Sequence, residues 1–381
     1  KCMEVFSLRE VYTPPQKSEY NLIENNVFGP TSLSGIQYAG NRSIIRRNVF
    51  YSAKTGMNWA NYGGNDPSDD PEAWWDEQNR FYNNTIYGCE RAADAATLTR
   101  LDDLGGLYGD NVMINNIVAG GTTAQQIAID WDAVPSDLTF VHNNIRGEMA
   151  GVDLFWWLDK PGPDAYYTVA EIEADYPDHY RENTEHDPRF VDTAEPDFHL
   201  RSDSLCIDAG APLTTTVGDG NGTSIPVADA LFFTDGYGMT SGDRIVVGQE
   251  RVEVASVDYP GNRLTVDRSI SWDDQCPVHT DFNGEGPDLG AFESDAGPTQ
   301  DGGDGSDGAD DAHPADAGRD GACDASDAGD EDDSGSIGGN CGCQGAGDAT
   351  AGAGWGFSMV WLLFFKRRRS TSEHPGNWRR A

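Results

Sequence analysis

A short phrase built around asparagine recurs along the first 150 residues, and it constrains the fold more than any other feature. It reads LIENNVF, IIRRNVF, RFYNNTI, VMINNIV and FVHNNIR. Aligned on their last Asn, the phrases place that residue at Asn26, Asn48, Asn84, Asn116 and Asn144, at intervals of 22, 36, 32 and 28 residues. One short interval among longer ones indicates a coil of fixed circumference, interrupted by loops of varied length.

The residues around each Asn favour short strands that stack in parallel. An apolar residue precedes each Asn by three positions, at Ile23, Ile45, Phe81, Met113 and Val141. Runs such as GIQYAG and MINNIV are brief and bounded by Gly or Asn, as short strands are. Asn tolerates the left-handed backbone of sharp corners, and stacked Asn side chains can bond one another. We therefore predict that the five Asn residues are corner residues in a structural ladder, in preference to a ligand-binding ladder.

On these coils the chain resembles the right-handed parallel β-helix superfamily, the pectate-lyase-like solenoids, over roughly residues 18–210. The resemblance implies an all-β fold with a solenoid over residues 1–212, and it implies little about activity. The chain begins at Lys1 in the middle of this pattern, so we expect it to be part of a longer exported protein.

Two blocks beyond the coils carry a closing signature. A short helix is predicted over residues 168–184, where Thr168 and Glu171 form a capping box and Pro177 stands at the end. The segments DPRFVDTAEPDFHLRSDSLCIDAGAP (187–212) and DFNGEGPDLGAFE (281–293) are similar to the last coils of bacterial surface β-helix proteins, including the choice-of-anchor group. The resemblance implies that residues 281–294 complete the solenoid. We expect Asp187, Asp192, Asp208 and Asp288 to serve mainly as turn and cap residues, with catalysis as the alternative.

The residues between these blocks, 213–280, form a candidate inserted module. Alternating strand patterns are separated there by Asp-Gly, Gly-Asp and Pro-Gly-Asn turns, which predicts a small antiparallel β-barrel. Cys206 and Cys276 flank the module. We predict a disulfide between them, which would contribute roughly 4 kcal/mol through loop-closure entropy.

The C-terminal part of the chain is predicted to be a spacer followed by a sorting signal. Residues 295–340 hold 14 acidic residues against Arg319 alone, as in disordered, self-repelling spacers. Residues 341–381 carry a Cys-Gly-Cys motif, the apolar run 353–365 and four basic residues. This order resembles the myxobacterial-type (MYXO-CTERM) sorting tail, which implies processing or lipid attachment at Cys341 or Cys343 and display at the cell surface or outer membrane. An ordinary weak membrane anchor is the alternative.

Charge excludes some partners. The formal net charge is −38, and residues 1–294 carry 48 acidic and 19 basic side chains, so nucleic acid is not an expected partner. Polyuronates are also repelled, unless Ca²⁺ bridges the two. Asp66, Asp69 and Asp70 form a loop cluster that could hold Ca²⁺, although a role in solubility alone explains them as well. No other cofactor is predicted.

Aromatic and acidic residues in the long intervals supply the candidate chemistry. Trp59, Trp74, Trp75, Trp131, Trp156 and Trp157 are either platforms for sugar rings or residues that pack loops onto the solenoid. Asp130 and Asp132 flank Trp131 on one face of a strand, about 6.5–7 Å apart, a spacing that suits the two carboxylates of a glycoside hydrolase. For a uronate lyase, the one group of bases is Lys54 with Arg46 and Arg47.

These observations lead to three hypotheses. The first is an exported, surface-tethered β-helix that binds polysaccharide or acts as a rigid scaffold. The second is a polysaccharide-degrading enzyme, as a hydrolase in preference to a lyase. The third is a purely structural or adhesive surface protein.

Overall fold

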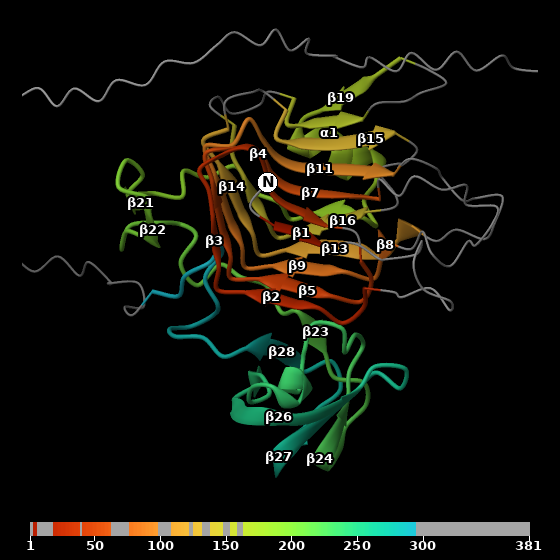
Figure 1. Cartoon of the computed structure of the whole chain (residues 1–381). Helices are drawn as coiled ribbons and strands as arrows, with labels where there is room; N and C mark the ends of the chain where they lie inside the picture. The colour runs from red at the N-terminus through yellow and green to blue at the C-terminus, as the bar shows by residue number, and fades with distance from the viewer. Residues whose placement is uncertain are drawn as a thin grey trace, which may run out of the picture. The chain divides into compact units, whose positions relative to one another are not determined.

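A computed structural model describes residues 3–5, 18–38, 40–61, 76–97, 108–121, 125–131, 138–147, 153–157 and 163–294 (Figure 1). All of them belong to one compact unit, residues 1–305. Among them, no helix is long and apolar enough to span a membrane. Several predictions lie outside the described residues: the spacer and sorting tail with Cys341 and Cys343, the aspartates Asp66, Asp69 and Asp70, and the residues Trp74, Trp75 and Asp132.

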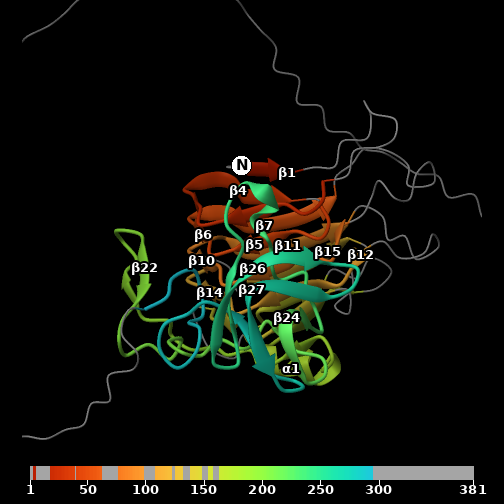
Figure 2. The same ribbon diagram turned by 90° about the horizontal axis from the view of Figure 1, so that it is seen from below.

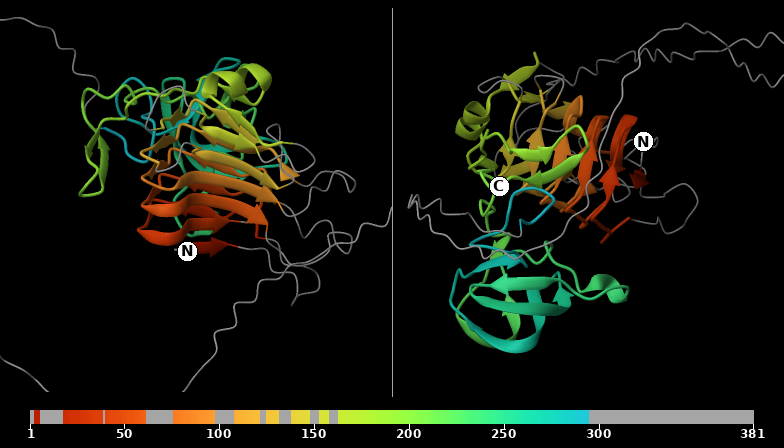
Figure 3. Two further views of the ribbon diagram at one scale, coloured as in Figure 1. Left: turned by 90° about the horizontal axis from the view of Figure 1, so that it is seen from above. Right: turned by 90° about the vertical axis from the view of Figure 1, so that its left-hand side faces the viewer.

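The fold is the predicted right-handed parallel β-helix with an inserted antiparallel barrel. Its coils stack three parallel sheets, and the stack is visible from red to yellow in Figures 1 and 3. The six-stranded barrel-side sheet contains β2 (Leu22–Glu24), β5 (Ile44–Arg46), β9 (Arg80–Tyr82), β13 (Asn111–Ile114), β16 (Leu138–Val141) and β20 (Tyr180–Arg181). The five-stranded hairpin-side sheet contains β3 (Val27–Phe28), β6 (Val49–Tyr51), β10 (Thr85–Tyr87), β14 (Ile117–Ala119) and β17 (Asn144–Ile145).

The third sheet, the lateral sheet, has seven strands. They are β1 (Met3–Val5), β4 (Thr31–Tyr38), β7 (Ala53–Asn61), β11 (Arg91–Thr97), β15 (Ile127–Trp131), β18 (Phe155–Trp157) and the antiparallel β19 (Ala165–Tyr167). A further parallel pair joins β8 (Asp76–Glu77) to β12 (Tyr108–Gly109).

The Asn ladder exists, with one shift in register. The side-chain amides of Asn26, Asn48, Asn84, Asn116, Asn143 and Asn183 bond in sequence, each Nδ2 donating to the next Oδ1 at 2.9–3.1 Å. The fifth rung is therefore Asn143, so the prediction of Asn144 was wrong. Asn144 instead pairs with Ile117 as the first residue of β17.

The left-handed corner is also one residue earlier than predicted. Positive φ angles occur at Asn25, Arg47, Asn83, Asn115, His142 and Glu182, each immediately before a ladder residue. The corner residue turns the chain, and the next residue points into the stack, because one left-handed residue bends the chain sharply between two strands. Doubled Asn therefore serves two roles in the coils that have it.

A second ladder, which the sequence analysis missed, marks the entry into the barrel-side sheet. The backbone N–H groups of Asn21, Ser43 and Asn79 donate to the side chains of the next coil, at Ser43 Oγ, Asn79 Oδ1 and Asn111 Oδ1, at 3.0–3.2 Å. Each lies five residues before a rung of the first ladder. The sequence signal was therefore an Asn or Ser separated by four residues from the ladder Asn in four successive coils.

The interior of the coils is apolar and is closed at one end by the predicted helix. Ile23, Ile45, Phe81, Met113, Phe140 and Tyr180 are stacked in register inside the barrel-side sheet. Helix α1 (Val169–Asp175) has the predicted capping box and ends before Pro177. It is shorter than predicted, because residues 180–184 form the last coil. Glu173 of the helix accepts from Asn183 Nδ2 at 3.0 Å and so terminates the ladder.

The inserted module is a six-stranded antiparallel barrel, as predicted. Its strands are β23 (Thr214–Thr215), β24 (Gly220–Pro226), β25 (Arg244–Val247), β26 (Glu250–Asp258), β27 (Arg263–Trp272) and β28 (Pro277–Thr280), with a 3₁₀ turn at Gly236–Gly238. A bridge between Thr216 and Val227 joins the first and last strands of the sheet. Barrel strands β24, β26 and β27 lie in front of the coils in Figure 2. Barrel side chains and outward residues of the barrel-side sheet form one apolar cluster, which includes Ile44, Tyr82, Ile225 and Phe233.

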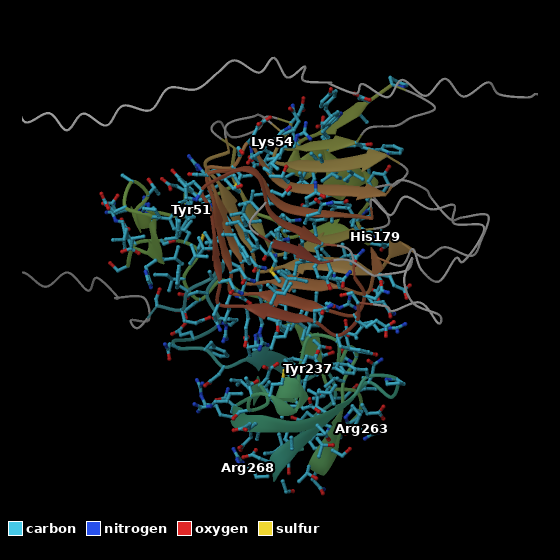
Figure 4. All side chains as sticks on the ribbon, viewed as in Figure 1. Tyr51, Lys54, His179, Tyr237, Arg263 and Arg268 are labelled. Carbon is cyan, nitrogen blue, oxygen red and sulfur yellow. The ribbon has the colours of Figure 1, made fainter. Side chains whose placement is uncertain are left out.

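The closing blocks do not form the last coils, so that prediction was wrong. Strands β21 (Phe190–Asp192) and β22 (Asp197–Leu200) form an antiparallel hairpin. Phe190 and Phe198 pack on the outer face of the hairpin-side sheet, against Tyr87 at 5.7 and 5.2 Å between ring centroids. Tyr51 lies toward the same hairpin (Figure 4). The apolar side chains of the block can bury themselves there without adding a coil.

Corner asparagines hold the closing blocks to the coils. Asn83 Nδ2 donates to Asp288 O at 2.8 Å, and Asn115 Nδ2 donates to Ala211 O at 2.9 Å. Gly290 has a φ of +90°, and a Cβ there would lie 2.7 Å from Thr85 Oγ1, so only glycine permits this close approach.

Asp187 and Asp192 form local turns, as predicted, whereas Asp208 and Asp288 join the two closing blocks to each other. Asp187 accepts from Arg189 N, Asp192 from Ala194 N, Asp208 from Glu285 N, and Asp288 from Asp208 N.

The predicted disulfide is absent. Cys206 and Cys276 are both free thiols. Cys206 packs with Phe190 and Leu289 in the cluster under the hairpin, whereas Cys276 lies against the barrel cluster. Backbone pairing of Thr214 and Thr215 with β28 closes the neck of the barrel instead.

Candidate functional site

The outward row of the lateral sheet brings an aromatic pair to its far end. Gln37, Asn58, Asp94, Ala128 and Trp156 are in register across β4, β7, β11, β15 and β18. Trp156 is then paired with Tyr166 of the antiparallel β19. Gln37, Asn58 and Ala128 are buried, at 4%, 8% and 0% exposed, whereas the β18–β19 end of the row is partly exposed.

Trp156 and Tyr166 form the candidate binding platform. Directly opposed residues of an antiparallel pair project from the same face with their Cβ atoms about 5 Å apart. Trp156 is half-buried and Tyr166 is 47% exposed. The guanidinium carbon of Arg91 lies 4.7 Å from the centroid of the Trp156 ring, a cation–π contact. Trp156 Nε1 is buried and has no hydrogen-bond partner, so the indole N–H is not exposed to a ligand at this site.

The structure separates the predicted tryptophans. Trp157 packs against the interior cluster, so the adjacent Trp156 and Trp157 point to opposite faces of β18. Trp59 lies in β7 in register with the buried Tyr38. Trp131 is the last residue of β15, in register with Thr97. Among the described tryptophan side chains of the coils, only Trp156 projects outward.

Tyr166 was missed by the sequence analysis. The available signal was the pair Tyr166–Tyr167 just before the capping box of the helix. Tyr167 packs against the interior cluster, so this second aromatic pair is divided between two faces in the same way as the tryptophans.

The predicted carboxylate pair is only partly described. Asp130 lies in β15 in register with Ala96, while Asp132 lies outside the described residues. Of the bases considered for a lyase, Arg46 is buried in ion pairs and Arg47 donates to Asp281 O at 3.3 Å. Lys54 is exposed at the start of β7 (Figure 4).

A second site, the corner cleft, contains a carboxyl group with a shifted pKa. This cleft of about 590 Å³ is lined by Glu24 and Arg47 of the coils, Arg244 and Asp281 of the barrel, and Glu293 of the closing block. Burial, and to a lesser extent the nearby Asp288 charge, raise the pKa of Glu293 to about 7. Its Oε1 accepts from Asp288 N at 3.2 Å, and its Oε2 has no partner. A carboxyl group in this state can exchange a proton near neutral pH.

No cluster for a metal ion is present in the described part of the chain, where no three His, Cys, Asp or Glu side chains come together. Neither protein-family models, curated proteins nor solved structures gave a match to this chain. The class of the protein is therefore defined by its fold, a parallel β-helix with an inserted barrel.

Proposed function

We propose that this protein is an exported, surface-tethered β-helix that binds polysaccharide without cleaving it. The observation that carries the proposal is the outward pair Trp156–Tyr166 at the β18–β19 end of the lateral sheet. Aromatic rings stack on the apolar faces of sugar rings. Arg91 beside the Trp156 ring adds a positive charge to the platform.

The arrangement of the other two sheets supports the same proposal. The barrel covers the outer face of the barrel-side sheet, and the closing hairpin covers the outer face of the hairpin-side sheet. A glycan would therefore approach at the β18–β19 end of the lateral sheet, where Trp156 and Tyr166 are partly exposed. The two ladders make this support rigid, because each coil bonds to the next through side chains as well as backbone.

A glycan array followed by calorimetry tests the proposal. Trp156→Ala and Tyr166→Ala should each weaken binding of the best glycan at least about tenfold, since a stacked base or sugar ring contributes on the order of 1–3 kcal/mol. Leu205→Ala is the matched control, because Leu205 is an apolar side chain that is 65% exposed on the closing block. Binding that is equal in the wild type and in both platform variants would refute the site, and absence of any glycan binding would refute the function.

A hydrolase is the second candidate, and Glu293 is the observation that favours it. A carboxyl group with a pKa of about 7 in a cleft is suited to act as a general acid, with Asp281 or Glu24 as the second carboxylate. Release of reducing sugar that is lost in Glu293→Gln and retained in Trp156→Ala would support this candidate over the first. No release of sugar from any glycan that binds would count against it.

A further inference from the structure

A cleft beside the closing hairpin gathers three arginines. It has a volume of about 610 Å³. Its lining includes Gly120, Gly147 and Tyr87, together with Arg146, Arg189 and Arg201. At Gly120, where φ is +64°, a Cβ would lie 2.5 Å from the Tyr87 ring, so the backbone is held close against the aromatic side chain. Small residues therefore leave room above this part of the surface.

The three guanidinium groups come from three separate segments. Arg146 follows β17, Arg189 precedes β21 and Arg201 follows β22. Arg146 donates one hydrogen bond, from Nη1 to Glu185 O at 3.3 Å. Because a guanidinium group has five donors, most of its capacity is left for solvent or a ligand.

One aspartate, Asp203, neutralises two of the arginines. Its Oδ2 lies 2.5 Å from Arg189 Nη1, and its Oδ1 lies 3.6 Å from Arg201 Nε. All three side chains are about half exposed, at 48%, 48% and 59% for Asp203, Arg189 and Arg201. Asp187, the other acid in the lining, uses Oδ1 to accept from Arg189 N. With three cations and two carboxylates, the cleft is locally positive on a chain whose net charge is −38.

We propose that this cleft binds a tetrahedral oxyanion, a sulfate or a phosphate, either free or as an ester on a sugar. A carboxylate is satisfied by one guanidinium fork, whereas a tetrahedral anion offers oxygens in several directions at once. Guanidinium groups that enter from three segments match the second geometry. The site is separate from the Trp156–Tyr166 platform and does not depend on it.

Titration with simple anions tests the site. Sodium sulfate and sodium phosphate should raise the melting temperature of the full chain more than sodium chloride does at equal ionic strength. Arg146→Gln and Arg201→Gln should each weaken sulfate binding about fivefold or more. Arg268→Gln is the control, because Arg268 is a half-exposed barrel residue paired with Glu250 at 2.8 Å (Figure 4). Asp203→Asn should tighten binding severalfold, because it removes the internal counter-ion.

The outcomes distinguish the sources of the anion. A sugar sulfate that binds more tightly than inorganic sulfate identifies a sugar ester as the ligand, and equal affinities identify the free anion. A response to sulfate that equals the response to chloride would overturn the proposal. So would unchanged sulfate affinity in an Arg146→Gln variant whose melting temperature without ligand is that of the wild type.

Discussion

Arg46 and Asp243, 197 residues apart in the sequence, form two hydrogen bonds at 2.8 and 2.6 Å. Their side chains are 5% and 7% exposed. Burial by itself would lower the pKa of Arg46, but Tyr82, Asp243 and Glu24 together raise it well above its ordinary value. This ion pair joins the barrel-side sheet to the barrel, as does the pair of Arg80 with Asp229 at 2.9 Å.

Removal of one partner of this pair should be strongly destabilising. Asp243→Ala leaves a buried guanidinium with only Glu24 as its counter-ion, and we expect a loss of about 3–5 kcal/mol in the free energy of unfolding. Glu250→Ala, which breaks the exposed pair with Arg268, should cost less than about 1 kcal/mol. Urea denaturation monitored by circular dichroism measures both. Equal effects of the two substitutions would show that the buried pair does not hold the barrel.

An interior rung of the ladder should matter more than the first rung. Asn84 is fully buried and bonds to Asn116 as well as to the carbonyls of Ile45 and Tyr82. Asn84→Ala also leaves the Asn48 amides without their acceptor, so we expect a loss of about 2–4 kcal/mol in the free energy of unfolding. Asn26→Ala, at the exposed end, should cost about 1 kcal/mol or less. Chemical denaturation measures the free energy of unfolding of both variants. A larger loss in Asn26→Ala than in Asn84→Ala would contradict the ladder.

The free energy of unfolding should decrease as pH rises, because Glu293 loses its proton. Its pKa is about 7 in the folded protein and near 4.3 in an unfolded chain, so the folded state binds the proton more tightly. The contribution of the Glu293 proton to the free energy of unfolding is complete below about pH 4 and is lost as pH rises through 7. His279 acts in the opposite direction, because burial lowers its pKa to about 4 and its contribution is lost as pH falls below about 6.5.

Comparison with Glu293→Gln isolates the contribution of Glu293. The difference in melting temperature between the wild type and the variant should change by several degrees between pH 5 and pH 8, in the direction that favours the wild type at pH 5. His279 is present in both proteins and cancels in this difference. A difference independent of pH would show that Glu293 titrates as it does in water.

The two cysteines that flank the barrel should react independently with thiol reagents. Burial raises the pKa of the Cys206 thiol to about 11 and also raises the pKa of the partly exposed Cys276. Alkylation of the native protein at pH 8 should therefore modify Cys276 before Cys206, and unfolding without a reductant should expose both. Peptide mass spectrometry distinguishes them. If neither thiol is alkylated after unfolding, the two cysteines form the disulfide that was predicted from the sequence.

Much of the fold was predictable from local sequence. The coil repeat, the capping box at Thr168 and Glu171, and the turn roles of Asp187 and Asp192 were all predicted. Each of these features depends on residues within a few positions of one another, or on a phrase repeated once per coil. Local hydrogen bonds of Asp, Asn and Thr to nearby backbone follow directly from residue type and spacing.

The errors share a cause. The ladder register failed at Asn144, because FVHNNIR has its corner at His142 and only stacking on Asn116 identifies Asn143 as the rung. The candidate site was half predicted, since Trp156 was named and Tyr166 was not. Their pairing requires β19 to turn back on β18, which no local pattern specifies.

The sequence by itself determined that the chain winds into coils, and it located the corner of each coil to within two residues. Tertiary structure decided what covers those coils: the barrel through Arg46 and Asp243, and the closing block through Asn83 and Asp288. The physical reason is the length of chain between the partners, 197 and 205 residues for these two contacts. Local propensity and periodicity act over one coil, whereas burial of an outer sheet face depends on which distant segment reaches it.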